Sequence, residues 1–383
     1  MGEKNSQLTE NIVDVLPAGG LDRKLARNVP LRVKLGIDPT APDIHLGHTV
    51  VLGALAEFQQ AGHIAVLIIG DYTARIGDPS GRSKERPVLS DEELDANAES
   101  YAQQAFKILD PSRTEIRRNS EWLAGLDFAE ILRITRTATV ARLLERDDFA
   151  NRMAEQAPIS VTELLYPLIQ GYDSVAVQAD VELGGTDQLY NLLTGRDVML
   201  EYGLEPQVVM TLPILVGTDG KDRMSKSRGN YVGLTESPEE QFGKIMSIPD
   251  EALSDFWSLC LPAEEPTTGP MESKLALARG IVERYHSTAA AEEAAAYFTR
   301  VVRESAIPDD IPVIIVEAGT VLHLPAFLKE HFGESASHWR RVVTQGGVRI
   351  EGDPIPNLDF EVCAGPPIVL QAGKRRFIRI KPN

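Results

Sequence analysis

Residues 35–48 read LGIDPTAPDIHLGH, and this stretch decides the fold of the chain. The apolar residues of 33–37 predict a buried strand, two prolines predict a turn, and apolar residues at helical spacing after position 48 predict a helix. His45 and His48 therefore stand at a helix N-terminus, where imidazoles and the helix dipole can stabilise a phosphate under attack. Gly47 has no side chain, so a flat ligand such as a purine can lie against the backbone.

A second polar segment stands about 175 residues later. Residues 217–230 read GTDGKDRMSKSRGN, with the cations Lys221, Arg223 and Lys226 among small residues. Most loops of this composition are simply solvated basic loops. A glycine-flanked loop of this kind also suits a mobile segment that brings an ammonium group onto the β- and γ-phosphates of a nucleotide. Neither segment has metal-ligand spacing, because no cysteine or third histidine stands near His45 and His48.

The two segments together resemble the HIGH and KMSKS signatures of class I aminoacyl-tRNA synthetases. The chain has HLGH and RMSKS, so Arg223 stands where the family more often has lysine. Arginine keeps the charge but not the geometry of lysine. The resemblance implies an ATP-dependent adenylation with Mg²⁺ as the partner of ATP and no metal bound by the protein.

A third block narrows the resemblance. Tyr166, Gln170 and Asp173 are spaced at i, i+4 and i+7, on one face of a predicted helix, and GGTDQLYN follows at 184–191. Such a polar face is normally just solvated. Its apolar neighbours place this helix in a core, where polar groups need partners or a ligand. With DYTARIGDPSGR at 71–82, the block resembles the bacterial tyrosyl-tRNA synthetases from about Val33 to the C-terminus.

The resemblance implies three sets of site residues. The catalytic set, at the phosphates, is Thr40, His45, His48, Arg223 and Lys226. The set around tyrosine is Lys34, Gly36, Thr73, Asp78, Tyr166, Gln170 and Asp173. The set around ATP is Asp38, Gly47, Arg82, Arg86, Gly185, Asp187, Gln188, Met224 and Ser225. Within these sets, Asp173 would accept the phenolic proton, and Gln188 would lie near the α-carboxylate and the phosphate.

Two further positions depart from the family pattern. Many members have tyrosine at the position of Lys34, where it donates a second hydrogen bond to the substrate hydroxyl. The lysine indicates either a subgroup of bacterial tyrosyl enzymes that shares it or an ion pair with a nearby carboxylate, possibly Asp173. Leu35 cannot donate the side-chain hydrogen bond to the ribose that some members make.

Length and composition limit the number of domains and the cellular compartment that we expect. The chain has 383 residues, 43% of them hydrophobic, which suffices for two or three domains with a sizeable core. Its two cysteines, Cys260 and Cys363, fit a reduced cytoplasm, and the first 20 residues lack the pattern of a signal peptide. No run approaches the 18 apolar residues of a membrane span, so we expect a cytoplasmic protein.

We expect an α/β protein with three parts. A Rossmann-like class I synthetase catalytic domain covers 1–230, with β runs at 32–37, 64–69, 175–181 and 208–212 and a charged helical insertion at about 85–157. In the family this insertion builds a dimer interface, so we expect a homodimer. An α-helical domain at 231–310 would contact the anticodon. A small α+β RNA-binding domain follows at 321–383.

The distribution of charge favours an RNA partner only in the C-terminal segment. The net charge of −17 argues against nucleic acid, but basic residues outnumber acidic ones in 321–383. The candidates for phosphate contacts with tRNA are Arg340, Arg341, Lys374 and Arg375. The leading hypothesis is tyrosine–tRNA ligation, which uses L-tyrosine, ATP and tRNA(Tyr). The alternatives are another amino acid such as tryptophan, adenylylation of a phosphate-bearing small molecule, and a non-catalytic RNA-binding paralogue.

Overall fold

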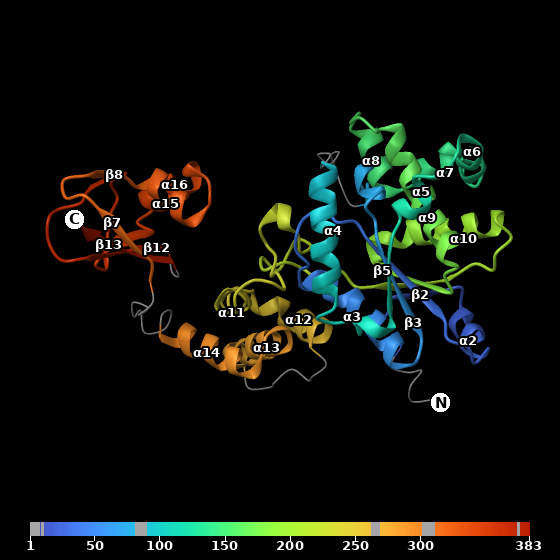
Figure 1. The fold of residues 1–383 in the computed structure, drawn as a ribbon, viewed down its shortest axis with the longest axis horizontal. Helices are drawn as coiled ribbons and strands as arrows, with labels where there is room; N and C mark the ends of the chain where they lie inside the picture. The colour runs from blue at the N-terminus through green and yellow to red at the C-terminus, as the bar shows by residue number, and fades with distance from the viewer. Residues whose placement is uncertain (1–7, 9–10, 81–89, 262–268, 301–310, 374–375) are drawn as a thin grey trace. The chain divides into compact units, whose positions relative to one another are not determined.

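The computed structural model describes residue 8 and residues 11–80, 90–261, 269–300, 311–373 and 376–383. They form two compact units, Met1–Ser287 and Thr288–Asn383 (Figure 1). Arg82, Arg86, Lys374 and Arg375, which the sequence nominated for ATP and RNA contacts, lie outside the described residues.

The first unit is built on a six-stranded sheet in the order β1-β6-β5-β2-β3-β4. All neighbouring strands pair in parallel except β1, which is antiparallel to β6. The interior strand β3 is apolar throughout, because helices cover both faces of a parallel sheet. The strands are β1 (Asp14–Leu16), β2 (Arg32–Ile37), β3 (Ile64–Ile69), β4 (Thr114–Arg118), β5 (Val181–Gly185) and β6 (Val208–Leu212).

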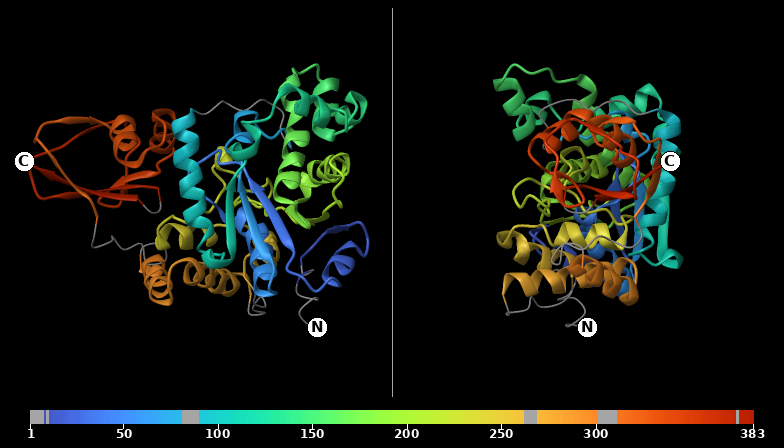
Figure 2. Two further views of the ribbon diagram at one scale, coloured as in Figure 1. Left: turned by 45° about the vertical axis from the view of Figure 1, so that its right-hand side comes forward. Right: turned by 90° about the vertical axis from the view of Figure 1, so that its left-hand side faces the viewer.

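The connections between parallel strands distribute the helices over the two faces of the sheet. Figure 1 and the left view of Figure 2 show α3 (Leu46–Gln60) and α4 (Asp91–Ala105) on one side of the sheet. On the other side, α9 (Val161–Val177) packs against α10 (Leu189–Glu201). The order in which strands are added reverses between the parallel strands β2 and β5, and ligands bind at such a point in open α/β sheets.

Two expectations about this unit were wrong. The strand expected at 175–181 is β5 at 181–185, because α9 continues to Val177. Tertiary packing of α9 on α10 outweighs the β preference of the valines near its end. The segment 85–157 is not wholly a helical insertion, because it contains the crossover helix α4 and the edge strand β4. The short helices that follow β4 are α5 (Ser120–Leu123), α6 (Phe128–Thr135), α7 (Val140–Leu144) and α8 (Asp147–Ala154).

Helices complete the first unit and begin the second. The remaining helices of the first unit are α2 (Gly20–Leu25), α11 (Pro238–Ile245), α12 (Leu253–Cys260) and α13 (Pro270–Tyr285). The boundary between the units falls after Ser287, so α14 (Thr288–Phe298) belongs to the second unit. The segment 231–310, expected as one helical domain, is therefore divided between the two units.

The second unit is α+β, as expected. Its larger sheet has the order β10-β9-β12-β13-β7, and β8 pairs with β11. Helices α15 (Leu324–Phe332) and α16 (Ala336–Thr344) share a core with this sheet, centred on Leu328, Trp339 and Leu370. The strands are β7 (Val313–Val316), β8 (Val321–His323), β9 (Val348–Ile350), β10 (Asp353–Pro354), β11 (Asp359–Glu361), β12 (Ile368–Ala372) and β13 (Arg376–Pro382).

Candidate active site

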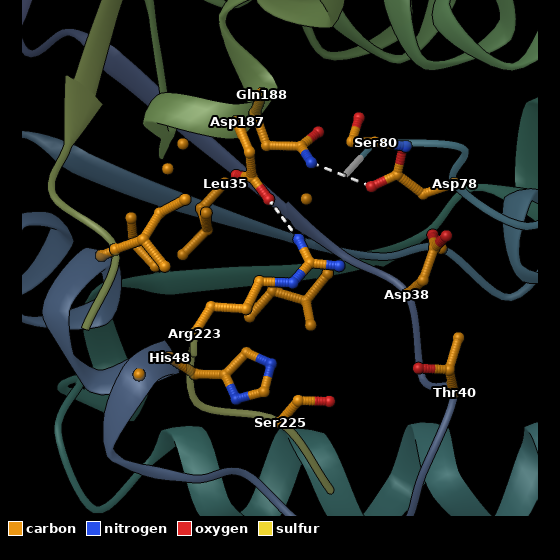
Figure 3. A pocket seen from close by; sticks show the side chains of 18 of the residues that line it. Leu35, Asp38, Thr40, His48, Asp78, Ser80, Asp187, Gln188, Arg223 and Ser225 are labelled. Atoms are coloured by element: carbon orange, nitrogen blue, oxygen red, sulfur yellow. Dashed lines mark hydrogen bonds and ion pairs between the residues drawn. The ribbon is translucent and has the colours of Figure 1, made fainter. Parts of the chain in front are cut away.

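The site is a cavity of about 480 Å³ at the carboxyl ends of the parallel strands. Asp38 follows β2, Gly70 follows β3, and Asp187 lies two residues after β5. Pro213 follows β6 and closes another side. Segments far apart in the sequence therefore meet around one space (Figure 3).

His45 and His48 cap the N-terminus of α3 at one end of the cavity. The Nδ1 atom of His45 accepts from the Gly47 amide at 3.2 Å, and Nδ1 of His48 accepts from the His45 amide at 3.3 Å. A neutral imidazole that accepts at Nδ1 carries its proton on Nε2. Each ring therefore has an Nε2–H donor left for a ligand.

Both imidazoles are held in the neutral form. Burial, followed by the nearby Lys226 charge, lowers the pKa of His48 to about 4. Burial also lowers the pKa of His45 well below its ordinary value, and the neighbouring His48 and Lys226 add to this effect. At neutral pH each imidazole is therefore an uncharged N–H donor, so positive charge in the cavity must come from other residues.

The loop at 217–230 contributes two cations to the cavity, Arg223 and Lys226, and both are paired with carboxylates. Lys226 Nζ lies 2.6 Å from Asp43 Oδ2, and Arg223 Nη1 lies 2.9 Å from Asp187 Oδ2 (Figure 3). Burial and the charge of Asp78 raise the pKa of Asp187, and the Arg223 guanidinium opposes them. The phosphate end thus holds its charges in internal pairs that a nucleotide would exchange for its own.

The opposite end of the cavity is organised around Asp173 on α9. Trp122 Nε1 donates to Asp173 Oδ1 at 2.8 Å, and Asn119 Nδ2 donates to Oδ2 at 3.3 Å. Burial raises the pKa of Asp173 to about 7, although the Lys34 charge and these two donors favour the ionised form. The carboxylate lines the cavity, where it can accept one more hydrogen bond.

The Asp38 carboxylate links Thr73 and Tyr166 in the wall of the cavity. It accepts from Thr73 Oγ1 at 2.7 Å and from the Tyr166 hydroxyl at 2.9 Å. A Cβ atom at Gly70 would stand 2.1 Å from Asp38 Oδ1, so only glycine permits this close approach. The hydroxyl proton of Tyr166 is therefore engaged with Asp38.

Lys34 does not line the cavity, and this corrects its assignment to the tyrosine set. Its side chain is wholly buried, and Nζ lies 2.7 Å from Glu182 Oε1. Nζ also donates to Ser174 Oγ at 2.8 Å and to the Gln170 carbonyl at 3.2 Å. The ion pair suggested with Asp173 forms with Glu182 instead, because β2 and β5 are adjacent parallel strands and these two residues are in register.

The same carboxylate orients Gln170. Its Nε2 lies 3.4 Å from Glu182 Oε1, a weak contact that turns the amide nitrogen away from the cavity. Among the described residues, the buried Oε1 of Gln170 is one of few side-chain polar atoms without a partner. An oxygen of this kind, in a residue that lines the cavity, fits a donor supplied by a ligand.

Most of the remaining sequence-predicted residues line one cavity. The nominated residues that line the cavity are Gly36, Asp38, Thr40, His45, Gly47, His48, Thr73, Asp78, Tyr166, Gln170, Asp173, Gly185, Asp187, Gln188, Arg223, Met224, Ser225 and Lys226. Sequence reasoning missed Asn119 and Trp122, which hold Asp173. Asn119 directly follows β4, so a correct prediction of that strand would have pointed to it.

Comparisons with known proteins agree with this geometry. The family model for class I tRNA synthetases of the tryptophan and tyrosine type matches residues 26–303. The chain belongs to this family. A tyrosine–tRNA ligase of Thermotoga maritima is 49% identical over 386 residues, which cover 97% of this chain and 96% of the relative. One from Bordetella avium is 48% identical over 373 residues, covering 94% and 91% of the two chains.

Solved structures share the fold of this synthetase. The tyrosyl-tRNA synthetase of Archaeoglobus fulgidus, solved with L-tyrosine, matches with a TM-score of 0.63 at 24% identity. The match covers 77% of this chain and 99% of that one. A truncated mitochondrial tyrosyl-tRNA synthetase of Aspergillus nidulans gives 0.64 at 23% identity, covering 77% and 92%.

Proposed function

We propose that this chain activates tyrosine with ATP in the cavity described above and passes the tyrosyl group to the 3′ end of tRNA(Tyr). Tyrosine–tRNA ligation is the activity of its family members at about half sequence identity over nearly the full length. One observation carries the residue assignment. The neutral imidazoles His45 and His48, the loop cations Arg223 and Lys226 and the buried carboxylate of Asp173 line the same cavity.

In the first step an oxygen of the tyrosine carboxylate attacks the α-phosphorus of ATP, and pyrophosphate leaves. No side chain becomes covalently attached. The Nε2–H groups of His45 and His48 donate to the phosphate oxygens on which charge develops. Lys226 and Arg223 leave Asp43 and Asp187 to grip the departing pyrophosphate, and Thr40 assists at this end. Catalysis is by positioning and by charge stabilisation.

ATP is held by groups near the end of β5 and on α3. We assign the ribose to Gly185 and Asp187, and the adenine to the open backbone at Gly47. A Cβ atom at Gly47 would lie 3.0 Å from His45 Cε1, so a side chain there would displace the imidazole. Mg²⁺ enters as the counter-ion of ATP and supplies charge neutralisation. Among the described residues, no group of three or more His, Cys, Asp or Glu side chains forms a metal site.

Tyrosine is selected by Asp173 and anchored at its ammonium. Asp173 accepts the phenolic proton, and an amino acid without that hydroxyl would leave the buried carboxylate short of a donor. The ammonium donates to Gln170 Oε1, to Asp78 and to the Tyr166 oxygen. The unpartnered Gln170 oxygen supports this arrangement.

The second unit supplies RNA contacts. Arg340 and Arg341 are exposed on α16, where they can reach phosphates. Arg376 is engaged differently, because it pairs with both Glu334 oxygens and lies over the Trp339 ring. We further propose that helices after residue 231 contact the anticodon.

We also propose a cytoplasmic homodimer. Large apolar side chains are exposed on consecutive helices beyond the sheet edge, among them Phe128 on α6, Val140 on α7 and Met153 on α8. Exposed apolar surface of this kind marks an interface. Among the described residues, no helix has the length and hydropathy of a membrane span.

The proposal is tested by amino-acid-dependent ATP–pyrophosphate exchange without tRNA. We expect exchange with tyrosine and none above background with phenylalanine or tryptophan. Tryptophan is the specific competitor, because the matching family model includes the tryptophan enzymes. Exchange with tryptophan alone would overturn the Asp173 assignment, and the absence of exchange with all three would overturn adenylation.

A further inference from the structure

A buried guanidinium lies behind the substrate-facing residues Asp78 and Gln188. Arg146 precedes α8, and only 7% of it is exposed. It pairs with Asp148 at 2.8 Å, which compensates its charge, and it lies over the rings of Phe149 and Tyr190 at 5.0 and 5.1 Å. Arg146 does not line the cavity, and the adenylation step above makes no use of it.

Arg146 begins a chain of directional hydrogen bonds. Its Nη1 donates to Asn191 Oδ1 at 2.8 Å, and Asn191 Nδ2 donates to Gln188 Oε1 at 3.0 Å. Gln188 Nε2 then donates to Asp78 Oδ2 at 2.9 Å (Figure 3).

The donor-to-acceptor direction of this series of hydrogen bonds is fixed at both ends. A guanidinium can only donate, and an ionised carboxylate can only accept. Each amide between them must therefore place its oxygen toward Arg146 and its nitrogen toward Asp78. A second path has the same origin, since Arg146 Nη2 donates to Ser80 Oγ at 3.1 Å and the Ser80 amide donates to Asp78 Oδ1 at 2.9 Å.

We propose that Arg146 and Asn191 are positioning residues that determine which end of the Gln188 amide faces the substrate carboxylate. This inference rests on the proposed function, in which Gln188 lies where the tyrosine carboxylate meets the α-phosphate. With the observed orientation, the amide group presents its second N–H to that carboxylate. The reversed orientation would place the Gln188 oxygen against two anionic groups, Asp78 and the substrate carboxylate, and repel both.

Asn191→Asp is the decisive variant, because it keeps the shape and reverses the hydrogen bonding. The carboxylate introduced at this position can accept from Arg146 but cannot donate to Gln188, so the glutamine turns its nitrogen toward residue 191. We measure the dissociation constants of L-tyrosine and of L-tyrosinol, which lacks the carboxylate, with the full chain. We expect tyrosine to bind roughly 10- to 100-fold more weakly and tyrosinol to change less than about threefold.

We call the hydrogen-bonded path from Arg146 through Asn191 and Gln188 to Asp78 the relay. Companion variants distinguish the relay from a purely structural role of these residues. Arg146→Lys still only donates and keeps the ratio of the two constants near the wild-type value, whereas Arg146→Met raises it. Arg152→Lys is the matched control: Arg152 is also buried, and its guanidinium pairs with Glu163 at 2.7 Å and donates to the Pro158 carbonyl. It should lower stability without changing the ratio.

Three results would overturn the relay. The first is an equal loss of tyrosine and tyrosinol binding in Asn191→Asp, and the second is no loss of either. The third is a wild-type ratio in Arg146→Met, which also decides the matter if Asn191→Asp does not fold. Failure of the unaltered chain to bind tyrosine is a different result, because it would overturn the proposed function and the relay with it.

Discussion

The two ends of the cavity hold their charged groups in opposite ways. At the amino-acid end, Asp173 is buried, and Trp122 and Asn119 hold it in place through neutral donors. At the nucleotide end, Lys226 and Arg223 form partly exposed ion pairs with Asp43 and Asp187. The first arrangement is rigid and selective, because burial makes an unmet hydrogen bond costly. The second is exchangeable, since partly exposed ion pairs contribute little.

The largest effect should come from the ion pair beneath the amino-acid end. Lys34→Met leaves Glu182 buried without its counter-charge, and we expect a loss of about 3–5 kcal/mol in the free energy of unfolding. Urea denaturation measures it. The double variant Lys34→Met/Glu182→Met should recover most of the loss. A single-variant loss below about 1 kcal/mol would contradict a rigid amino-acid end.

The next effect concerns the neutral donors at the nucleotide end. His48→Ala should slow adenylate formation by about 10²- to 10³-fold, with little change in tyrosine affinity. Pre-steady-state measurement of adenylate formation tests this. His48→Gln keeps an N–H donor and should lose less. An equal loss in both variants would argue that the imidazole charge, and not its N–H, is what matters.

Asp173→Ala should erode selectivity at the other end. We expect the ratio of kcat/KM for tyrosine to that for phenylalanine to fall roughly 10- to 100-fold, because the hydroxyl loses a charged acceptor. Pyrophosphate exchange with both amino acids gives this ratio. Asp38→Asn serves as a comparison, because Asp38 also lines the cavity but contacts Tyr166 and Thr73. An unaltered ratio in Asp173→Ala would remove Asp173 from the side-chain pocket.

The pH dependence should separate the two ends. The raised pKa of Asp173, about 7, means that its carboxylate is lost as the pH falls through neutrality. Between about pH 8 and 6 we expect kcat/KM for tyrosine to fall about tenfold, relative to phenylalanine. His48, with a pKa of about 4, stays neutral over this range and cannot cause the change. The decline should disappear in Asp173→Asn, and its persistence there would assign it to another group.

The smallest effect should come from freeing a loop cation. Asp43→Asn removes the carboxylate that competes with phosphate for Lys226, so the KM for ATP should fall about two- to fivefold. Steady-state exchange at varied ATP measures it. Asp222→Asn is the matched control, because Asp222 pairs with Arg228 in the same loop and neither residue lines the cavity. A raised KM in Asp43→Asn would show that Asp43 itself assists ATP.

The sequence motifs, through the family that they resemble, nominated many of the residues that line the cavity. The motif around His45 specifies a strand, a turn and a helix N-terminus within residues 35–48, and its two imidazole caps are local, although its backbone also pairs with Val232 and Leu234. The loop around Lys226 has a composition that indicates phosphate contact. The edge strand β4 was missed because its residues TEIRR lack the apolar run of a buried strand, and only pairing with β3 reveals it.

The sequence by itself determined the chemistry of the groups and the segments that carry them, because side-chain type, spacing and helix capping are local properties. Tertiary structure alone decided which of these groups face substrate and which face each other. Lys34 pairs with Glu182, Trp122 donates to Asp173, and Arg146 donates to Asn191. In each pair the two residues are 45 or more positions apart in the sequence. Such contacts form because burial obliges every charged or polar group to find a partner, and only the packed sheet and helices bring those partners within reach.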